Sequence, residues 1–169
     1  VGVTTIVPAT MTFGEDKLLK IAEAAREHRN GQGAILCGIH MEGPFISMEK
    51  KGAQNGAYIH RPDVELFERL QKASGGLFKI VDLAPEEEGA MEFIRQEAGK
   101  VVLSIAHTAA DYETARKAME AGVTHMTHLY NAMHPIHHRN PGPVIAAADD
   151  GRCEAELICD GVHIHPAVV

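Results

Sequence analysis

Three side chains that can bind a metal ion follow three separate apolar runs of the sequence. Glu42, His107 and His128 each come shortly after such a run. One carboxylate and two neutral imidazoles are suitable ligands for Zn²⁺ or a similar divalent ion, with a position left for water. If the runs are parallel strands of one sheet, their carboxyl ends share the edge where α/β proteins build sites. The sequence therefore predicts a metal site at these three residues.

Each of these residues also has an ordinary structural interpretation. A single histidine at a strand end is more often a hydrogen-bonding loop residue than a ligand. Glu42 could be a surface or helix-capping carboxylate, and the following Gly43-Pro44 is typical of a simple turn. His125 precedes His128 by three residues, so on an extended strand the two point to opposite faces and only His128 reaches the site. The recurrence on three strands favours the metal site.

The elements that would position these residues alternate regularly along the chain. The expected strands are mostly continuous in apolar character, as in strands buried on both faces, and cover residues 4–8, 34–39, 79–84, 101–106, 123–127 and 155–159. Apolar residues recur at helical spacing in the expected helices, which cover residues 15–28, 63–73, 86–98 and 111–121. A further helix is expected to start at residues 165–167. Repeated β-α units predict a parallel sheet with right-handed crossovers.

The chain length leaves two architectures open. With 169 residues, the chain is too short for two ordinary domains. The expected strands begin about every 30 residues, so eight units would need about 240 residues, close to the length of a (β/α)8 barrel. Six units fit either an open doubly wound sheet or a single, incomplete barrel domain over residues 1–169.

Composition excludes several classes of protein. A formal net charge of −7 argues against binding nucleic acid through the overall field. The absence of an apolar run near 18 residues argues against a membrane span, and the first residues lack the features of a signal peptide. The cysteines Cys37, Cys153 and Cys159 form no C-x-x-C motif, which favours a reducing compartment.

Longer motifs around the candidate site resemble the N-acetylglucosamine-6-phosphate deacetylase family of the amidohydrolase superfamily. The motifs, in chain order, are GIHMEGPF (38–45), KGAQN (51–55), LAPE (83–86), AHT (106–108), THLYNAM (127–133) and DGVH (160–163). The resemblance implies an α/β fold that is a partial (β/α)8 TIM barrel, with about six of the eight units, the second to seventh strands. It also implies a cytoplasmic enzyme of amino-sugar catabolism that forms a homodimer in its full-length form.

The resemblance also implies a role for individual residues. Glu42, His107 and His128 would hold one divalent metal ion, zinc or else iron or another divalent ion. Six residues would contact the amino-sugar phosphate: Ala53, Gln54, Asn131, Ala132, Arg139 and His163. Of these, Arg139 and His163 match positions that bind the sugar phosphate, in some members from the neighbouring subunit. Some members carry histidine where this chain has Gln54.

The implied reaction is metal-dependent hydrolysis of N-acetylglucosamine 6-phosphate to glucosamine 6-phosphate and acetate. The metal would activate water and polarise the acetyl carbonyl, and an aspartate would move the proton to the leaving amine. In the family this aspartate follows the eighth strand, and a His-x-His motif follows the first. Neither Asp82 nor Asp160 matches the aspartate, so no catalytic residue is assigned. The 169-residue chain alone is expected to bind metal without turnover.

Two alternatives to this reaction stay open. One is a non-catalytic module that binds metal and sugar phosphate, which the unassigned aspartate motivates. The other is an amidohydrolase that cleaves a different amide or a cyclic ureide. Arg139, His163 and the run 131–133 argue against the second alternative, because they fit a phosphorylated amino sugar.

Overall fold

The computed structural model describes residues 2–169 and has an α/β fold in which all the strands are parallel. Its elements are, in chain order, β1 (Thr5–Ile6), α1 (Glu15–Glu27), β2 (Ile35–Leu36), β3 (Ile39–Met41), the 3-10 helix η1 (Gly56–Tyr58), α2 (Val64–Ser74), β4 (Phe78–Leu83), α3 (Ala90–Glu97), β5 (Val102–Ile105), α4 (Tyr112–Ala121), β6 (His125–Met126), α5 (Gly142–Asp149) and β7 (Glu154–Ala155). Strands and helices therefore alternate as the sequence predicts.

The strands are arranged in the order in which they occur in the chain. Strands β3 to β7 form one sheet in sequential order, and β1 pairs with β2. The strand expected over 34–39 is divided into β2 and β3, with a register shift between Ile39 and His40. Pairing with the first strand continues there, because the His40 N–H donates to the Pro8 carbonyl at 3.0 Å. The order lacks the reversal that a doubly wound sheet requires, so the open doubly wound alternative is disfavoured.

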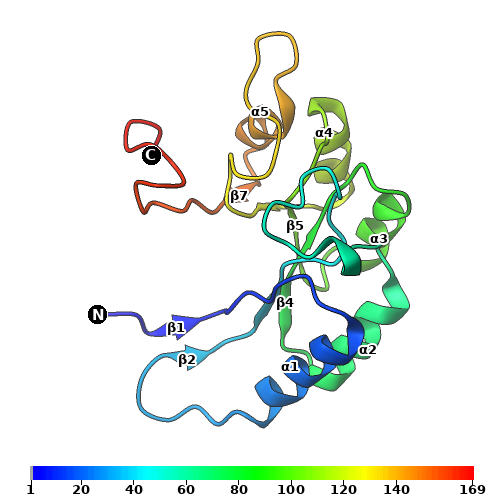
Figure 1. Cartoon of the computed structure of the whole chain (residues 1–169), viewed down its shortest axis with the longest axis vertical. Coiled ribbons are helices and arrows are strands. Elements are labelled where there is room, and N and C mark those ends of the chain that lie inside the picture. Colours follow the sequence, from blue (N-terminus) through cyan, green and yellow to red (C-terminus); the bar gives the residue numbers. More distant parts are fainter. Residues whose placement is uncertain (1) are drawn as a thin grey trace.

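The helices lie along one side of the strands (Figure 1). Four buried phenylalanines form the centre of the packing between them: Phe45, Phe67, Phe78 and Phe93. Their rings meet edge to face, with centroids 5.2 to 6.4 Å apart, a favourable geometry for aromatic pairs. Because Phe67 belongs to α2, Phe78 to β4 and Phe93 to α3, this cluster fixes two helices against the sheet.

Helices α2 and α4 begin at side-chain caps that the sequence contains. The Asp63 carboxylate accepts the Leu66 N–H at 3.0 Å, and the Asp111 carboxylate accepts the Thr114 N–H at 2.8 Å. Such caps satisfy backbone donors that have no partner within the helix. Helix α2 then ends at Gly75, which has φ 68° and so adopts the left-handed conformation that glycine tolerates.

The structure differs from the predicted helices in three places. The helix expected over 86–98 begins at Ala90, because Glu86 instead binds the loop that follows β5. Helix α5 was not predicted, because its sequence GPVIAAAD is apolar on nearly every side and lacks a helical period. The helix expected to start at residues 165–167 is wrong, since residues 166–168 form a turn.

Two further observations concern cysteines and membrane spans. Cys37, Cys153 and Cys159 are all free thiols. Burial raises the pKa of Cys153 to about 11, so this side chain is a neutral thiol near pH 7. Every helix within residues 2–169 is too short or too polar to cross a bilayer.

Candidate metal site

Glu42, His107 and His128 come together beyond the carboxyl ends of β3, β5 and β6. Glu42 Oε1 lies 3.0 Å from His107 Nε2 and 3.6 Å from His128 Nε2. The two Nε2 atoms are 3.1 Å apart. All three side chains are largely buried, so their charges are only weakly screened by water. The structure thus places side by side the three side chains that the sequence singles out.

The hydrogen bonds around these atoms suit them to hold a cation. His107 Nδ1 lies 2.9 Å from the Lys50 carbonyl, which can only accept, so Nδ1 carries the ring proton. In the neutral ring, Nε2 then presents a lone pair toward Glu42 Oε1 and His128 Nε2. Three acceptors at this spacing repel one another unless a proton or a metal ion lies between them. The donor set therefore fits a divalent ion held by one oxygen and two nitrogens.

The pKa values of Glu42 and His128 are shifted by their contact with each other. Burial raises the pKa of Glu42, but its interactions with the His107 and His128 imidazoles outweigh burial and hold this pKa well below its usual range. Burial lowers the pKa of His128, but its hydrogen bond with Glu42 more than reverses this and leaves the pKa raised. A proton on His128 thus balances the Glu42 carboxylate and competes with a metal ion for the same position.

Gln54 holds the Glu42 carboxylate in place. Its side chain is buried, with Nε2 donating to Glu42 Oε1 at 2.8 Å. At the other end of the amide, Oε1 accepts the Thr12 N–H at 2.7 Å, which fixes the orientation of the amide. The structure therefore gives Gln54 a contact with a metal-ligand candidate, which the sequence did not reveal. Partners of this kind orient metal ligands and tune their basicity.

Glu86 holds the loop that carries His107. Its carboxylate accepts a hydrogen bond from Thr108 Oγ1 at 2.6 Å and another from the Ala109 N–H. The sequence suggested only an acidic residue in the first turn of a helix. The position of Glu86 within the LAPE motif was the one available signal that it belongs to the site.

Backbone strain is concentrated at the same place. Among the described residues, the non-glycine residues with positive φ are His107 at 45°, His128 at 36°, Tyr130 at 78° and Ala132 at 53°. All four follow β5 or β6. Positive φ is uncommon outside glycine and clusters at functional sites, where the surrounding structure enforces it. No sequence pattern predicts this strain, which marks the turns carrying two of the three candidate ligands.

Four of the six expected substrate contacts lie in loops that border the metal-ligand candidates. Ala53 is exposed and precedes the buried Gln54. The Asn131 N–H donates to the His128 carbonyl at 3.0 Å, and Ala132 follows in the same turn. The contacts of these four residues with a sugar remain predictions.

The two expected phosphate-binding residues, Arg139 and His163, lie in exposed loops. The Arg139 backbone N–H donates to His137 Nδ1 at 3.3 Å, and His163 Nδ1 lies 2.7 Å from Asp160 Oδ2. Within residues 2–169, the hydrogen bonds of both residues stay inside their own loops. Neither residue is hydrogen-bonded to Glu42 within residues 2–169, and their role remains a prediction.

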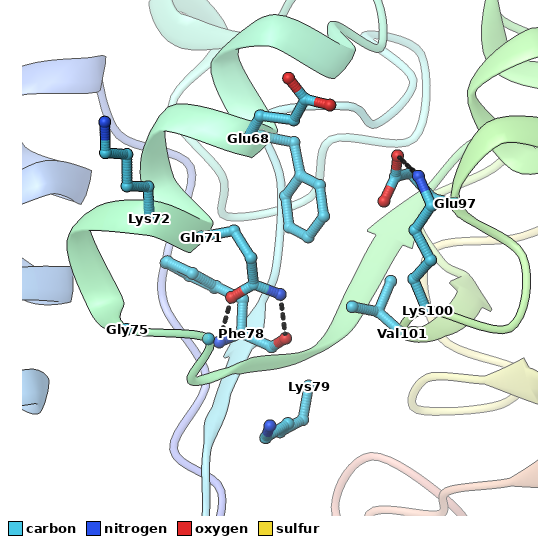
Figure 2. Close-up of a pocket in the computed structure, with 11 residues that line it drawn as sticks. Glu68, Gln71, Lys72, Gly75, Phe78, Lys79, Glu97, Lys100 and Val101 are labelled. Atoms are coloured by element: carbon cyan, nitrogen blue, oxygen red, sulfur yellow. Dashed lines mark hydrogen bonds and ion pairs between the residues drawn. The ribbon is translucent and has the colours of Figure 1, made fainter.

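A cavity of about 560 Å³ lies between α2 and α3, at the amino ends of β4 and β5 (Figure 2). This end of the strands is opposite to the one that carries Glu42. Several of its polar groups are already paired: the Gln71 amide binds both backbone groups of Phe78 at 2.8 and 3.1 Å, and Glu97 binds Lys100 at 3.0 Å. Since sites in α/β folds form at the carboxyl ends of strands, this cavity is not the candidate site.

Known proteins resemble this chain along almost its whole length. The amidohydrolase family model matches residues 2–168. N-acetylglucosamine-6-phosphate deacetylase of Bacillus subtilis is 45% identical over 98% of this chain and 43% of its own length. N-acetylgalactosamine-6-phosphate deacetylase of Escherichia coli O157:H7 is 36% identical over 98% of this chain and 44% of its own length.

A solved structure gives the same result. The crystal structure of N-acetyl-D-glucosamine-6-phosphate deacetylase from Mycobacterium smegmatis superposes with a TM-score of 0.92 at 40% identity, covering 99% of this chain and 44% of that chain. This chain therefore spans less than half the length of the relatives that it matches. The family match over residues 2–168 shows that the chain belongs to the amidohydrolase family.

Proposed function

We propose that this protein is a metal-dependent deacetylase that hydrolyses N-acetylglucosamine 6-phosphate to glucosamine 6-phosphate and acetate in amino-sugar catabolism. The observation that carries the proposal is the meeting of three possible metal-ligand atoms, from Glu42, His107 and His128, at one point. The named relatives support the substrate, as does the M. smegmatis enzyme variant solved in complex with N-acetyl-D-glucosamine-6-phosphate. These similarities favour a deacetylase over a non-catalytic module or another amidohydrolase.

The metal in this proposal is one zinc ion held by Glu42, His107 and His128. Iron or another divalent ion suits the same ligands, since availability also decides occupancy. When bound, the ion supplies Lewis acidity toward water and an amide carbonyl. The chain's own part is to hold the ligands: Gln54 orients the carboxylate, and the Lys50 carbonyl fixes the His107 tautomer.

Substrate recognition is divided between two regions in this proposal. Ala53, Gln54, Asn131 and Ala132 contact the sugar beside the metal, while a guanidinium and an imidazole bind the phosphate. The exposure of Arg139 and His163, away from the other candidate residues, suits groups that serve the site of a neighbouring subunit. We therefore include a homodimer in the proposal. Sedimentation analysis tests it.

The architecture in this proposal is one (β/α)8 barrel domain to which residues 1–169 contribute the second to seventh strands. Three observations support it: the sequential parallel order of the strands, the helices on one side of them (Figure 1), and the close superposition on the M. smegmatis enzyme. A cytoplasmic location belongs to the same proposal. Its support is the odd number of cysteines, all of which are free thiols.

Acetate release tests the proposed reaction. In the experiment, residues 2–169 replace the matching segment of the B. subtilis relative, and the Zn²⁺-loaded chimera is given N-acetylglucosamine 6-phosphate. We expect acetate release by the chimera and none by its Glu42→Gln variant. The 4-epimer, N-acetylgalactosamine 6-phosphate, is the comparison substrate, and its faster hydrolysis would reassign the sugar. A chimera that binds Zn²⁺ and releases no acetate from either sugar would contradict the proposed reaction.

A further inference from the structure

A second cluster of buried polar side chains crosses the sheet next to the metal site. Asp82 and Ser104 are fully buried, and Thr127, His40 and His125 are 3%, 4% and 7% exposed. These residues come from β3, β4, β5 and β6 and the residue that follows β6. Buried polar groups are costly unless they are hydrogen-bonded, so a cluster spanning four strands requires a reason beyond packing.

The hydrogen bonds of this cluster run in one direction and end at Asp82. Thr127 Oγ1 donates its one proton to Asp82 Oδ1 at 2.7 Å. Ser104 must then donate to Thr127 Oγ1 at 2.8 Å, and His125 Nδ1 must donate to Ser104 Oγ at 2.9 Å. From the other side, His40 Nε2 donates to Asp82 Oδ1 at 2.7 Å. The Asp82 carboxylate is the acceptor that sets the whole arrangement.

Asp82 thereby connects two of the three chain segments that carry metal-ligand candidates, those of Glu42 and His128. Thr127 is the residue before His128, and His40 lies two residues before Glu42. Both bonds go to the same oxygen, while Asp82 Oδ2 has no partner among residues 2–169. His128 has φ 36°, a strained conformation that persists only where neighbouring contacts enforce it. The hydrogen bond to Thr127 is a contact of this kind.

We propose that Asp82 is a positioning residue of the metal site, which fixes Glu42 through His40 and His128 through Thr127. This inference rests on the proposed function, because it requires that Glu42, His107 and His128 bind a metal. Asp82 touches none of the three itself, so its effect is expected in the affinity and geometry of the metal rather than in the presence of a ligand.

Co²⁺ binding to the full 169-residue chain tests the inference, since the visible absorption of Co²⁺ reports its coordination geometry. The Asp82→Ala variant removes both hydrogen bonds, and we expect Co²⁺ affinity to fall about tenfold, at the lower end of the effect of outer-sphere residues. Its visible band is expected to change in position or intensity. The Asp82→Asn variant retains an uncharged acceptor. Its Co²⁺ affinity should therefore lie between those of Asp82→Ala and the original chain.

The matched control is Glu97→Ala, which truncates another buried carboxylate. Glu97 is 3% exposed and pairs with Lys100 beside the cavity at the other end of the strands (Figure 2). Both truncations are expected to lower the melting temperature. Only Asp82→Ala is expected to change Co²⁺ affinity and the Co²⁺ spectrum, a difference that a merely structural role for Asp82 would not produce.

A second pair of variants keeps the test decisive if Asp82→Ala does not fold. Thr127→Val keeps the side-chain shape and removes the hydroxyl, whereas Thr127→Ser keeps the hydroxyl. We expect Thr127→Val to weaken Co²⁺ binding about tenfold, as Asp82→Ala does, and Thr127→Ser to restore most of the affinity. Because Thr127→Val removes the donor of this bond and Asp82→Asn only weakens its acceptor, the Thr127→Val/Asp82→Asn double variant should bind about as weakly as the weaker single variant.

The outcomes separate this inference from the proposed function. Unchanged Co²⁺ affinity and spectrum in folded Thr127→Val and Asp82 variants would overturn the role of Asp82 and leave the metal site intact. If the original chain binds no Co²⁺, or Glu42→Gln binds it equally well, the metal site itself is wrong and the inference fails with it.

Discussion

The metal-ligand candidates form one group of buried polar side chains. The Asp82 cluster, which consists of His40, Asp82, Ser104, His125 and Thr127, forms a second group on the same strands. The two groups differ in how their protons are arranged. At Glu42, His107 and His128, acceptors face one another at 3.0 to 3.6 Å. Around Asp82, each donor meets an acceptor at 2.7 to 2.9 Å. The first group is suited to a cation between its atoms, whereas these donors of the second group all find acceptors in the protein, and Asp82 Oδ2 has no partner among residues 2–169.

This difference separates a binding site from its support. A group of converging acceptors stores unfavourable electrostatics that a metal ion relieves, so its substitution should change metal binding first. A closed hydrogen-bond network stabilises the fold and positions its neighbours, so its substitution should change stability first. The following predictions apply this distinction, starting with the largest effect.

Loss of either imidazole should remove the metal. We expect His107→Ala and His128→Ala each to lower Zn²⁺ affinity more than hundredfold, beyond the effect of outer-sphere substitutions. Isothermal titration calorimetry and the metal content after dialysis measure this loss. The control is His125→Ala, which removes a buried histidine of the Asp82 cluster and should retain one equivalent of Zn²⁺. Stoichiometric metal in both His107→Ala and His128→Ala would overturn the ligand assignment.

Metal affinity should weaken as the pH falls. The pKa of His128 is raised above its ordinary value of 6.5, so below the raised pKa a proton occupies the nitrogen that the metal requires. We expect Zn²⁺ affinity to fall about tenfold per pH unit below that pKa and to level off above it. Glu42, whose pKa is strongly lowered, stays ionised and adds no pH dependence above pH 5. Competition titrations from pH 5.5 to 8.5 check this. A Zn²⁺ affinity that does not change with pH would contradict the competition between the proton and the metal for His128.

Removal of the Gln54 amide should weaken metal binding without abolishing it. Gln54→Ala deletes the donor that orients Glu42 Oε1, and we expect about a tenfold loss of Zn²⁺ affinity. The adjacent amide offers a control: Asn55 Oδ1 caps η1 through the Ala57 N–H, so Asn55→Ala should leave metal affinity unchanged. Equal effects of the two variants would show that Gln54 supports the loop rather than the carboxylate.

The smallest effect on metal affinity is expected from substitution of Ser104. Ser104→Ala removes the bonds to His125 and Thr127 but leaves the Thr127 bond to Asp82 in place. We expect a loss of about 1–3 kcal/mol in the free energy of unfolding, because buried polar groups lose their partner. Zn²⁺ affinity should not change. Urea unfolding with parallel metal titrations measures both, and an unaltered stability combined with weaker metal binding would reverse the roles given to the two groups.

The sequence predicted what depends on local pattern. Glu42, His107 and His128 follow separate apolar runs, and the shared edge of a parallel sheet was sufficient to expect them together. Helices α2 and α4 followed from apolar periodicity. Helix α5 could not be predicted in this way, because a helix buried on most sides has no polar face.

The sequence could not predict contacts between distant parts of the chain. The Asp82 cluster joins residues 21 to 87 positions apart, and each looks like an ordinary strand residue on its own. The second contact of Gln54 and the strained backbone at His107 and His128 likewise appear only in three dimensions. These features depend on tertiary packing, which overrides local preference.

The most direct test of the central claim is to locate the metal. A crystal of the 169-residue chain grown with Zn²⁺ gives an anomalous difference map at the zinc absorption edge. We predict one peak bonded to Glu42 Oε1, His107 Nε2 and His128 Nε2, at zinc–ligand distances of about 2.0–2.2 Å. A map with zinc bound only at other residues, or a peak at this position that survives in Glu42→Gln with unchanged occupancy, would contradict the account.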